Sequence, residues 1–299
     1  MLPKRQILAS KISNARSRNN ERQLERELQR FFDRLGKQVQ QNLEEYWSDH
    51  LLQGQVDLIT KPVSEAQAEY YLILQKYDKR EYQLGMQEAQ RLVELYTKGY
   101  ALKAVNRKLT PQVRLLQRMN LFGTLRGAEE DLLERVFVAS QATLARVDTS
   151  IKTLLTEGYQ SGKGINYVAN LLTRRFDQLQ TWESKRIART EIHNSHNTAV
   201  MDTYQELGVE YTMWISAGDD GRTRETHLGP ADGVPDGVDG EIIPMGGTYS
   251  NGLQYPGDTS GPIEEWINCR CSNAPYVIPY GYMAPPFSPF REEDLIKIR

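Results

Sequence analysis

Cysteine is nearly absent from this sequence, with two residues among 299. So small a number excludes a scaffold held together by disulfides, and it favours a reducing environment. No apolar run approaches the roughly 20 residues that a bilayer-crossing helix needs, so no membrane partner is expected. The first residues, MLPKRQILASKISNAR, contain no apolar core followed by a small-residue cleavage site. We therefore expect no secretory signal and a protein made and used in a soluble setting.

A large net charge is also missing, since the formal charge is −2 at pH 7 and the pI is about 6.2. The overall charge therefore gives no reason to expect a nucleic-acid-binding protein. Between Lys4 and Arg30, however, eight basic residues stand against three acidic ones. Two interpretations stay open for this basic stretch. It is either a solvated helix face or an arm that makes weak, non-specific contact with DNA or with an acidic partner.

Helical periodicity dominates the first two thirds of the chain. Apolar residues step by three and four through five stretches, 20–52, 64–99, 128–157, 164–176 and 182–207. Gly36 weakens the middle of the first stretch, and Pro62 forbids its continuation. Ser64, with Gln67 three residues later, indicates a capping box that opens the second stretch.

Single residues mark the other helix boundaries that we expect. Pro111 interrupts the polar stretch after the second helix, and Gly158 supplies the stop of the third. Thr181, followed by Ser184, opens the fifth helix, and Gly208 closes it. Long helices joined by short turns pack as bundles or extend as arms, and a chain of 299 residues has room for about two domains.

After the fifth helix, the pattern changes to the alternation that is typical of strands. Residues 209–215 alternate apolar and polar, although Trp214 breaks the pattern, and further strands are expected at 241–245 and 267–271. Five prolines interleaved with aromatic residues after Ser272 indicate an extended tail that lies over a surface or docks on a partner. We therefore expect a mainly α fold, in which long N-terminal helices precede a small α+β C-terminal domain with short strands and long loops.

The two cysteines and one histidine have the composition of a zinc site. In an extended segment, Cys269 and Cys271 point to the same face, so both sulfurs can address one point. His227 adds a nitrogen from the preceding loop, which gives the Cys/His mixture that suits structural zinc. Four residues are candidates for the remaining ligand: Asp219, Asp220, His193 and His196. The alternative is a pair of buried free thiols, with His227 hydrogen-bonded to a backbone carbonyl.

The loop DDGRTRETH alternates acidic and basic residues around a glycine. Asp219 and Asp220 stand beside Arg222 and Arg224, and this favours internal forks between guanidinium and carboxylate groups that order the loop. An enzyme interpretation makes Asp220 and His227 a general acid/base pair. The sequence offers no nucleophile or oriented third group for it, and it contains no GxGxxG opening a helix, no P-loop and no HExxH.

One stripe of the helix before this loop carries short polar side chains. Thr190, Asn194 and Asn197 follow one another at steps of four and three. Such side chains are suited to bonding the backbone of a loop that lacks secondary structure, so we expect the stripe to hold DDGRTRETH in place. Trp214 and Trp266 flank the loop and the cysteines, and they are expected to supply a small apolar core beneath it.

Several motifs follow one another in a recognisable order. A short amphipathic helix, GKGINYVANLLTRRF, precedes RIARTEIHNSHNTA, which is followed by a strand with Trp, by DDGRTRETH and by NCRC. In this order, the chain resembles the phage Mu F-like head morphogenesis family of minor head proteins over about Thr156 to Ser272. The positions that carry the resemblance are Arg189, Thr190, Glu191, Asp220, Arg222, Arg224, His227, Asn268, Cys269, Arg270 and Cys271. The Gly-rich run 229–261 enlarges the family's loop between its His and NCRC elements.

The resemblance implies a structural, non-enzymatic minor capsid protein of a tailed bacteriophage. Such proteins are present at low copy in the head, are associated with the portal protein oligomer, and act in head assembly, genome packaging and DNA ejection. The major capsid protein or a scaffolding protein is a further implied partner. The implied location is the virion, in the head interior or at the portal vertex, after assembly in the host cytoplasm. The toxin that some phages fuse to this domain has no room in the 28 residues after Cys271.

Periodicity and resemblance together divide the chain into three parts. Residues 1–155 are expected to form an extended helical partner-binding region, 156–272 the Mu F-like domain, and 273–299 a tail rich in proline and aromatic residues. A second function stays open, namely a metal-dependent nuclease or other enzyme that uses Asp220 and His227. Degradation of DNA by the purified protein with divalent metals discriminates between the two.

Overall fold

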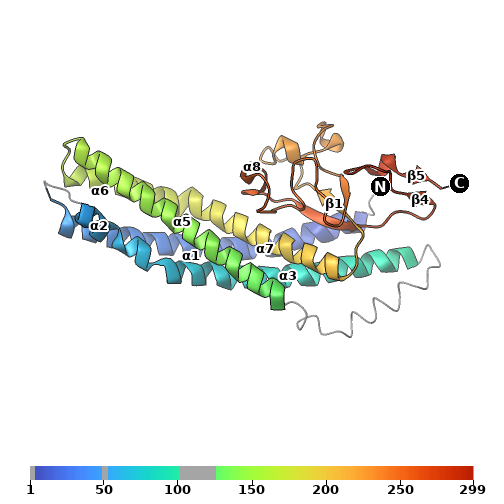
Figure 1. Cartoon of the computed structure of the whole chain (residues 1–299), viewed down its shortest axis with the longest axis horizontal. Helices are drawn as coiled ribbons and strands as arrows, with labels where there is room; N and C mark the ends of the chain where they lie inside the picture. Colours follow the sequence, from blue (N-terminus) through green and yellow to red (C-terminus); the bar gives the residue numbers. More distant parts are fainter. Residues whose placement is uncertain (1–3, 49–52, 102–125, 299) are drawn as a thin grey trace. The chain divides into compact units, whose positions relative to one another are not determined.

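The computed structural model describes the backbone of residues 4–48, 53–101 and 126–298, and the side chains of 17–48, 53–95 and 130–298 (Figure 1). Pro111 and the expected interruption of the helical pattern there lie outside the described residues. The predicted mainly α fold is confirmed, because long helices occupy the N-terminal part and short antiparallel strands follow. Among the described helices, none has the length and apolar composition that crossing a bilayer requires.

The chain forms two compact units, each assembled from segments that are distant in sequence. Unit 1 comprises Met1–Asn19, Lys79–Glu129 and Arg189–Arg299, and unit 2 comprises Asn20–Asp78 and Glu130–Ala188. The α-helices of the described chain are α1 (Lys4–Tyr46), α2 (Gln53–Glu65), α3 (Gln67–Ala101), α5 (Arg126–Gln160), α6 (Ile165–Gln178), α7 (Ser184–Glu206) and α8 (Ile263–Trp266). The sequence-based division after residues 155 and 272 stays a prediction.

The core of unit 2 follows the predicted helical periodicity. On α1, the apolar residues with at most 2% exposure are Leu24, Leu28, Phe31, Phe32, Leu35, Val39 and Leu43. Glycine allows two close approaches between helices of this unit. A Cβ on Gly36 would lie 2.8 Å from Cγ of Phe176, and a Cβ on Gly158 would overlap the Val168 side chain. Because Gly36 has no side chain, Phe176 of α6 packs directly against α1 at this point. This packing offsets the low helix propensity of glycine.

Three predicted helix boundaries are wrong, for identifiable local reasons. Pro62 lies inside α2. Because proline has no N–H, the Leu58 carbonyl lacks its helical donor, and the Asn42 side-chain amide donates to that carbonyl instead, at 2.8 Å. Ser64 is no capping residue, because its hydroxyl donates to the carbonyl of Lys61. Gly158 lies within α5, which continues to Gln160 and is followed by a glycine at φ +65°.

The expected break before the fifth helix is replaced by a π-helical turn over Leu179–Glu183, so the chain stays helical from α6 into α7. The Thr181 hydroxyl donates backwards to the carbonyl of Asp177, and the Ser184 hydroxyl donates to that of Leu179. These bonds satisfy carbonyls of the preceding turn rather than the free N–H groups of a new helix start. Arg175 forms an ion pair with Glu183 across the turn.

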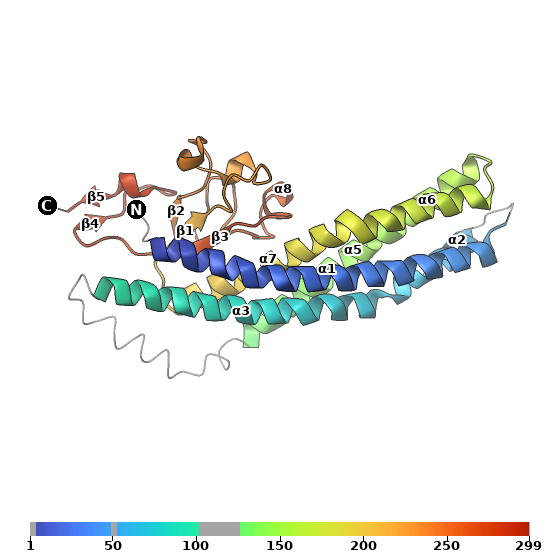
Figure 2. The same ribbon diagram turned by 180° about the vertical axis from the view of Figure 1, so that it is seen from behind.

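A three-stranded antiparallel sheet forms the centre of the C-terminal part of unit 1 (Figure 2). The strands are β2 (Ile242–Pro244), β1 (Tyr211–Ile215) and β3 (Ser272–Tyr276), in that order across the sheet. The predicted strands at 209–215 and 241–245 are confirmed. The strand predicted at 267–271 is wrong, because Asn268 adopts φ +58° and the pairing with β1 begins at Ser272.

Both faces of this sheet are covered, which explains why Trp214 does not fit the alternating pattern. One face carries a core of Met213, Ile242, Tyr276 and Phe290. The other face carries a core of Trp214, Val238, Ile243, Tyr249, Leu253, Cys269 and Cys271, with the half-buried Trp266 packed against it. The predicted tryptophan core is therefore confirmed.

Part of the stretch predicted to be an extended tail belongs to this fold. It contributes β3 to the sheet, and its later residues form a second antiparallel pair, β4 (Tyr282–Met283) with β5 (Ile296–Lys297). Phe290 is 3% exposed and forms a bridge with Ile242 at the edge of β2.

A buried charged cluster joins three helices within unit 1. His196 of α7 is hydrogen-bonded through Nδ1 to Glu81 at 3.0 Å, and its Nε2 lies 3.5 Å from Glu88, both on α3. Ser17 of α1 donates to the same Glu81 carboxylate at 2.5 Å. Burial lowers the pKa of His196, but the hydrogen bonds to Glu81 and Glu88 outweigh it and raise that pKa to about 9. The cluster therefore holds a charged imidazolium between two carboxylates.

This cluster predicts a loss of stability at alkaline pH. The folded-state pKa of His196 is about 9 and the unfolded value is about 6.5, so the contribution is complete below pH 6.5 and is lost as the pH rises through 9. The difference corresponds to roughly 3 kcal/mol. Urea unfolding of the full chain between pH 6 and 9.5 should show this decline, and His196→Gln should flatten it.

His193, on the same helix, provides the control. Burial, and then the nearby charge of His196, lower its pKa to about 3, so His193 is neutral in the folded chain. His193→Gln should therefore leave the alkaline decline intact. A free energy of unfolding that is constant from pH 6 to 9.5 in the unmodified chain would contradict the assignment.

Candidate metal centre

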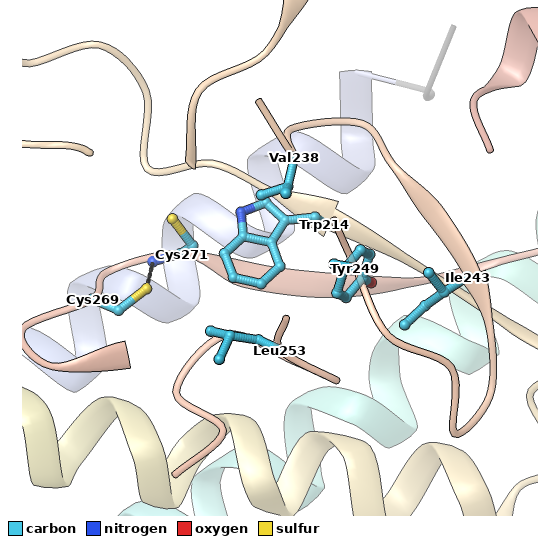
Figure 3. Close-up of a cluster of buried hydrophobic side chains, with 7 residues drawn as sticks. All are labelled: Trp214, Val238, Ile243, Tyr249, Leu253, Cys269 and Cys271. Atoms are coloured by element: carbon cyan, nitrogen blue, oxygen red, sulfur yellow. Dashed lines mark hydrogen bonds between the residues drawn. The ribbon is translucent and has the colours of Figure 1, made fainter. Parts of the chain in front are cut away.

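His227, Cys269 and Cys271 meet in the interior of unit 1. Their potential ligand atoms all lie within 4.8 Å of one another. Nδ1 of His227 is 3.6 Å from Sγ of Cys269 and 3.5 Å from Sγ of Cys271. The three residues are at most 3% exposed, and Figure 3 shows both cysteines beside the Trp214 indole. Two sulfurs and one imidazole nitrogen in a closed site form a donor set that can hold a metal ion.

The local backbone explains why the sulfurs converge. Asn268 in the left-handed region turns the chain after α8, and the Cys269 amide donates to the carbonyl of Trp266 at 3.2 Å. The chain then runs without regular secondary structure into β3, and the Cys271 amide lies 3.4 Å from the sulfur of Cys269. His227 is the last residue of the 3₁₀ turn Glu225–His227.

The two thiols differ in acidity because they share a hydrogen bond. The hydrogen bond with Cys271 lowers the pKa of Cys269, and the same bond raises the pKa of Cys271. Cys269 is therefore the first of the pair to become a thiolate. A thiolate is the form that binds metal ions.

The second nitrogen of His227 faces away from the sulfurs. Nε2 lies 2.9 Å from Oε2 of Glu265, which is on α8. The ring of Trp214 packs against the imidazole with centroids 5.1 Å apart in an edge-on arrangement. His227 thus bonds a carboxylate and not the backbone carbonyl that the free-thiol alternative assumes.

None of the four candidates for a further ligand joins the centre among the described residues. The Asp219 carboxylate accepts the amide of Gly221, and His196 belongs to the buried cluster with Glu81 and Glu88. His193 is buried on α7. Asp220 is bound by Arg270 in a two-pronged ion pair at 2.6 and 2.7 Å.

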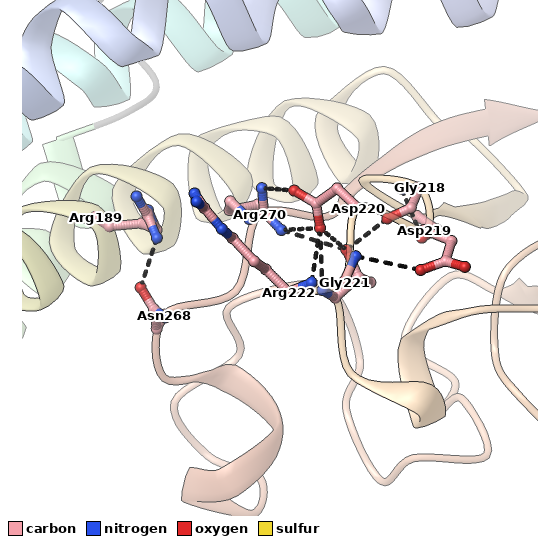
Figure 4. A network of polar contacts seen from close by, with 10 residues as sticks. Arg189, Gly218, Asp219, Asp220, Gly221, Arg222, Asn268 and Arg270 are labelled. Atoms are coloured by element: carbon pink, nitrogen blue, oxygen red, sulfur yellow. Dashed lines mark hydrogen bonds and ion pairs between the residues drawn. The ribbon is translucent and has the colours of Figure 1, made fainter.

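The Asp220–Arg270 pair orders the loop at 218–224, as Figure 4 shows. Asp220 also accepts the amides of Arg222 and Thr223. The Arg270 guanidinium holds the pKa of Asp220 well below its usual range. Arg224 donates to the backbone carbonyl of Ile267. The predicted forks from Arg222 and Arg224 to the loop's own carboxylates are therefore wrong, since the fork comes from Arg270 of the NCRC motif.

The polar stripe of α7 bonds the segment 268–271 and not the loop it was expected to hold. The Thr190 hydroxyl accepts the amide of Asn268 at 2.9 Å, and the Asn197 amide donates to the carbonyl of Cys271 at 3.1 Å. Arg189 donates to the side chain of Asn268 at 3.1 Å (Figure 4). The stripe therefore positions the two cysteines.

The other motif residues of α7 have different surroundings. Asn194 packs against Gly257, since a Cβ on that glycine would lie 2.7 Å from Oδ1 of Asn194. Glu191 is half-buried. The sequence patterns did not identify Glu265 and Glu81, and they named Arg270 as a motif position without indicating that it pairs with Asp220. The only signal for Glu265 was a carboxylate four residues before Cys269, which no motif distinguishes from its exposed neighbour Glu264.

These features define a mainly α chain with a closed His/Cys centre beside a small antiparallel sheet. Residues 149–274 match the family model described as Phage Mu protein F like protein. The resemblance drawn from the motifs is thereby confirmed, and the family indicates a phage head morphogenesis protein. Comparisons with curated proteins and with solved structures give no match to the chain.

Proposed function

We propose that this chain is a structural minor head protein of a tailed bacteriophage, bound to the portal oligomer and acting in head assembly and genome packaging or delivery. The observation that carries the proposal is the family match over residues 149–274. The proposed location is the head interior at the portal vertex, after assembly in the host cytoplasm. The major capsid protein or a scaffolding protein is a further proposed partner, and residues 4–30 make at most weak, non-specific contact with DNA.

The partners of Asp220 and His227 support a structural role over the nuclease alternative. Asp220 is engaged by Arg270 and by two loop amides, and its low pKa makes it a poor general base. His227 is 1% exposed and lies among Glu265 and the two thiols. A general acid/base pair needs access to substrate. The contacts of Asp220 and His227 instead join neighbouring loop segments to one another.

The surface of unit 2 supports its role in binding a partner. Large apolar side chains that are at least 37% exposed occur on α2, α3, α5 and α6 and beside them: Leu58, Leu72, Phe137, Val138, Tyr159, Tyr167 and Trp182. Leu72 is 58% and Val138 56% exposed. Aromatic and apolar residues of this kind are enriched at the centres of protein interfaces. We propose that the helices of unit 2, which include much of the predicted partner-binding region 1–155, make the contact with the portal.

Co-purification with the portal tests this assignment. The full chain, co-expressed with the portal protein, should be recovered with the portal oligomer. The double variant Leu72→Asp/Val138→Asp should lower that recovery at least tenfold while changing the free energy of unfolding by less than about 1 kcal/mol, because both side chains are exposed. Tyr280→Asp in unit 1, where the side chain is 92% exposed, is the matched control and should be recovered normally.

Two results would count against the proposed function. Absence of the unmodified chain from the portal fraction would remove the portal association. Degradation of DNA by the purified chain with divalent metal ions, abolished by Asp220→Ala and by His227→Ala, would favour the nuclease instead.

For the metal centre, the proposed ion is zinc in a structural role. Thiolate sulfur and imidazole nitrogen suit zinc, and all three donors are buried. The ion would join the loop that ends at His227 to the segment that carries Cys269 and Cys271. Outside the small core around Trp214, these two segments depend on polar bonds for their order.

A further inference from the structure

Glu265 lies outside the set of ligands, yet it contacts the centre more directly than any other acidic residue of the described chain. Its Oε2 is 2.9 Å from Nε2 of His227, and the side chains of the two residues are 14% and 2% exposed. A carboxylate that is largely removed from water is costly unless it accepts hydrogen bonds. A role as a solvated surface charge therefore does not explain why Glu265 is largely buried.

The contact decides which nitrogen of His227 can bind a metal ion. A neutral imidazole has one N–H donor and one nitrogen with a free lone pair, and an ionised carboxylate only accepts hydrogen bonds. In the neutral ring, the 2.9 Å contact with an ionised Glu265 requires the proton on Nε2, from which it is donated to the carboxylate. The lone pair then sits on Nδ1, which is the nitrogen that lies 3.5 and 3.6 Å from the two sulfurs.

Glu265 is itself held in place by neighbours from two other segments. The Thr226 hydroxyl donates to Oε2 at 3.0 Å, and the Asn251 amide approaches the same oxygen at 3.5 Å. The carbonyl of Thr226 in turn accepts the amide of Val238 at 3.0 Å. These bonds fix the carboxylate relative to the imidazole, since Thr226 immediately precedes His227 in the chain.

We infer that Glu265 is a positioning residue of the metal centre, which fixes the tautomer and the orientation of His227 so that Nδ1 is the ligand. This inference rests on the proposed metal centre. A carboxylate that accepts the second N–H of a ligating histidine raises the basicity of that ligand, and its loss typically costs 10–100-fold in metal affinity. Glu265 would be expected to contribute to the same extent here.

Zinc affinity and the tautomer of His227 test the inference together. In the full chain, competition with a chromophoric chelator should show that Glu265→Ala weakens zinc binding by about 10–100-fold. Glu265→Gln, which keeps one acceptor oxygen, should weaken binding less and is less liable to misfold. Glu264→Ala changes the exposed neighbour on α8 and should bind zinc like the unmodified chain.

The tautomer is read separately by ¹⁵N NMR of the His227 ring in metal-free protein. The unmodified chain should show the proton on Nε2, and Glu265→Ala should show a mixture of tautomers. An unchanged tautomer together with unchanged zinc affinity in both Glu265 variants would overturn the inference. The unmodified chain could instead bind no zinc while the Glu265 variants still change the tautomer of His227. In that case the proposed metal centre is wrong, and Glu265 orients His227 without a metal. The two failures are therefore distinguishable.

Discussion

Replacing Cys271 with serine is expected to remove the metal and to destabilise unit 1 by at least about 4 kcal/mol. The serine oxygen is a poor ligand for the site, and two donors, His227 and Cys269, remain to bind the ion. The loss also places a hydroxyl beside Trp214 in a core that is closed to water. A chelator should have a similar effect on the unmodified chain, and the helices of unit 2 should be spared.

The fluorescence of Trp214 reports this change, because its ring lies 5.1 Å from that of His227 and is fully buried. Val238→Ala is the matched control, since Val238 belongs to the same core cluster and is not a ligand. It should cost about 1–3 kcal/mol and leave the zinc content at one ion per chain. Far less than one zinc per chain in unmodified protein purified without added metal would end the hypothesis. The two cysteines would then be small core residues, and His227 would order its loop through the hydrogen bond with Glu265.

The sequence predicted the long helices well because their apolar residues are both periodic and buried. On α1, the same steps of three and four that identify the helix also identify its core face, from Leu24 to Leu43. The convergence of the two sulfurs was predictable for a similar reason. A spacing of two residues brings side chains to one side in any extended segment, so the wrong strand at 267–271 did not spoil the inference.

The wrong boundaries arose where a distant residue supplies what the local sequence lacks. Pro62 is compatible with a helix because Asn42 donates to the carbonyl that proline leaves without a partner. Likewise, α7 is buried at every position from Ile192 to Asn197, although it is rich in polar residues. Its histidine at 196 is accommodated by Glu81, more than a hundred residues earlier. Periodicity along a single helix contains no information about such partners.

The small sheet also depends on segments that are distant in sequence, because β1 pairs with β3. This dependence predicts a second large effect, on the folding of a fragment. A fragment that ends at residue 272, where motif resemblance ends, lacks most of β3, which pairs with β1 from Tyr211 to Ile215. A fragment of 156–272 also lacks Glu81 and the rest of α3 that contacts α7. Unpaired strand edges and buried polar groups without partners are costly. We therefore expect this fragment not to fold, and circular dichroism and hydrogen exchange would measure its loss of structure.

Two tyrosines four residues apart test the role of β3 in the full chain. Tyr276 is 4% exposed and packs against Met213, Ile242 and Phe290, whereas Tyr280 is 92% exposed. Tyr276→Ala should therefore lower the free energy of unfolding by about 3–5 kcal/mol, the cost of emptying a large aromatic site. Tyr280→Ala should change it by less than about 0.5 kcal/mol. Urea unfolding of both variants supplies the comparison. Equal and small effects would mean that residues after 272 lie on the surface as a dispensable tail. The expected difference makes them part of the core on one face of the sheet, opposite the face that carries the two cysteines.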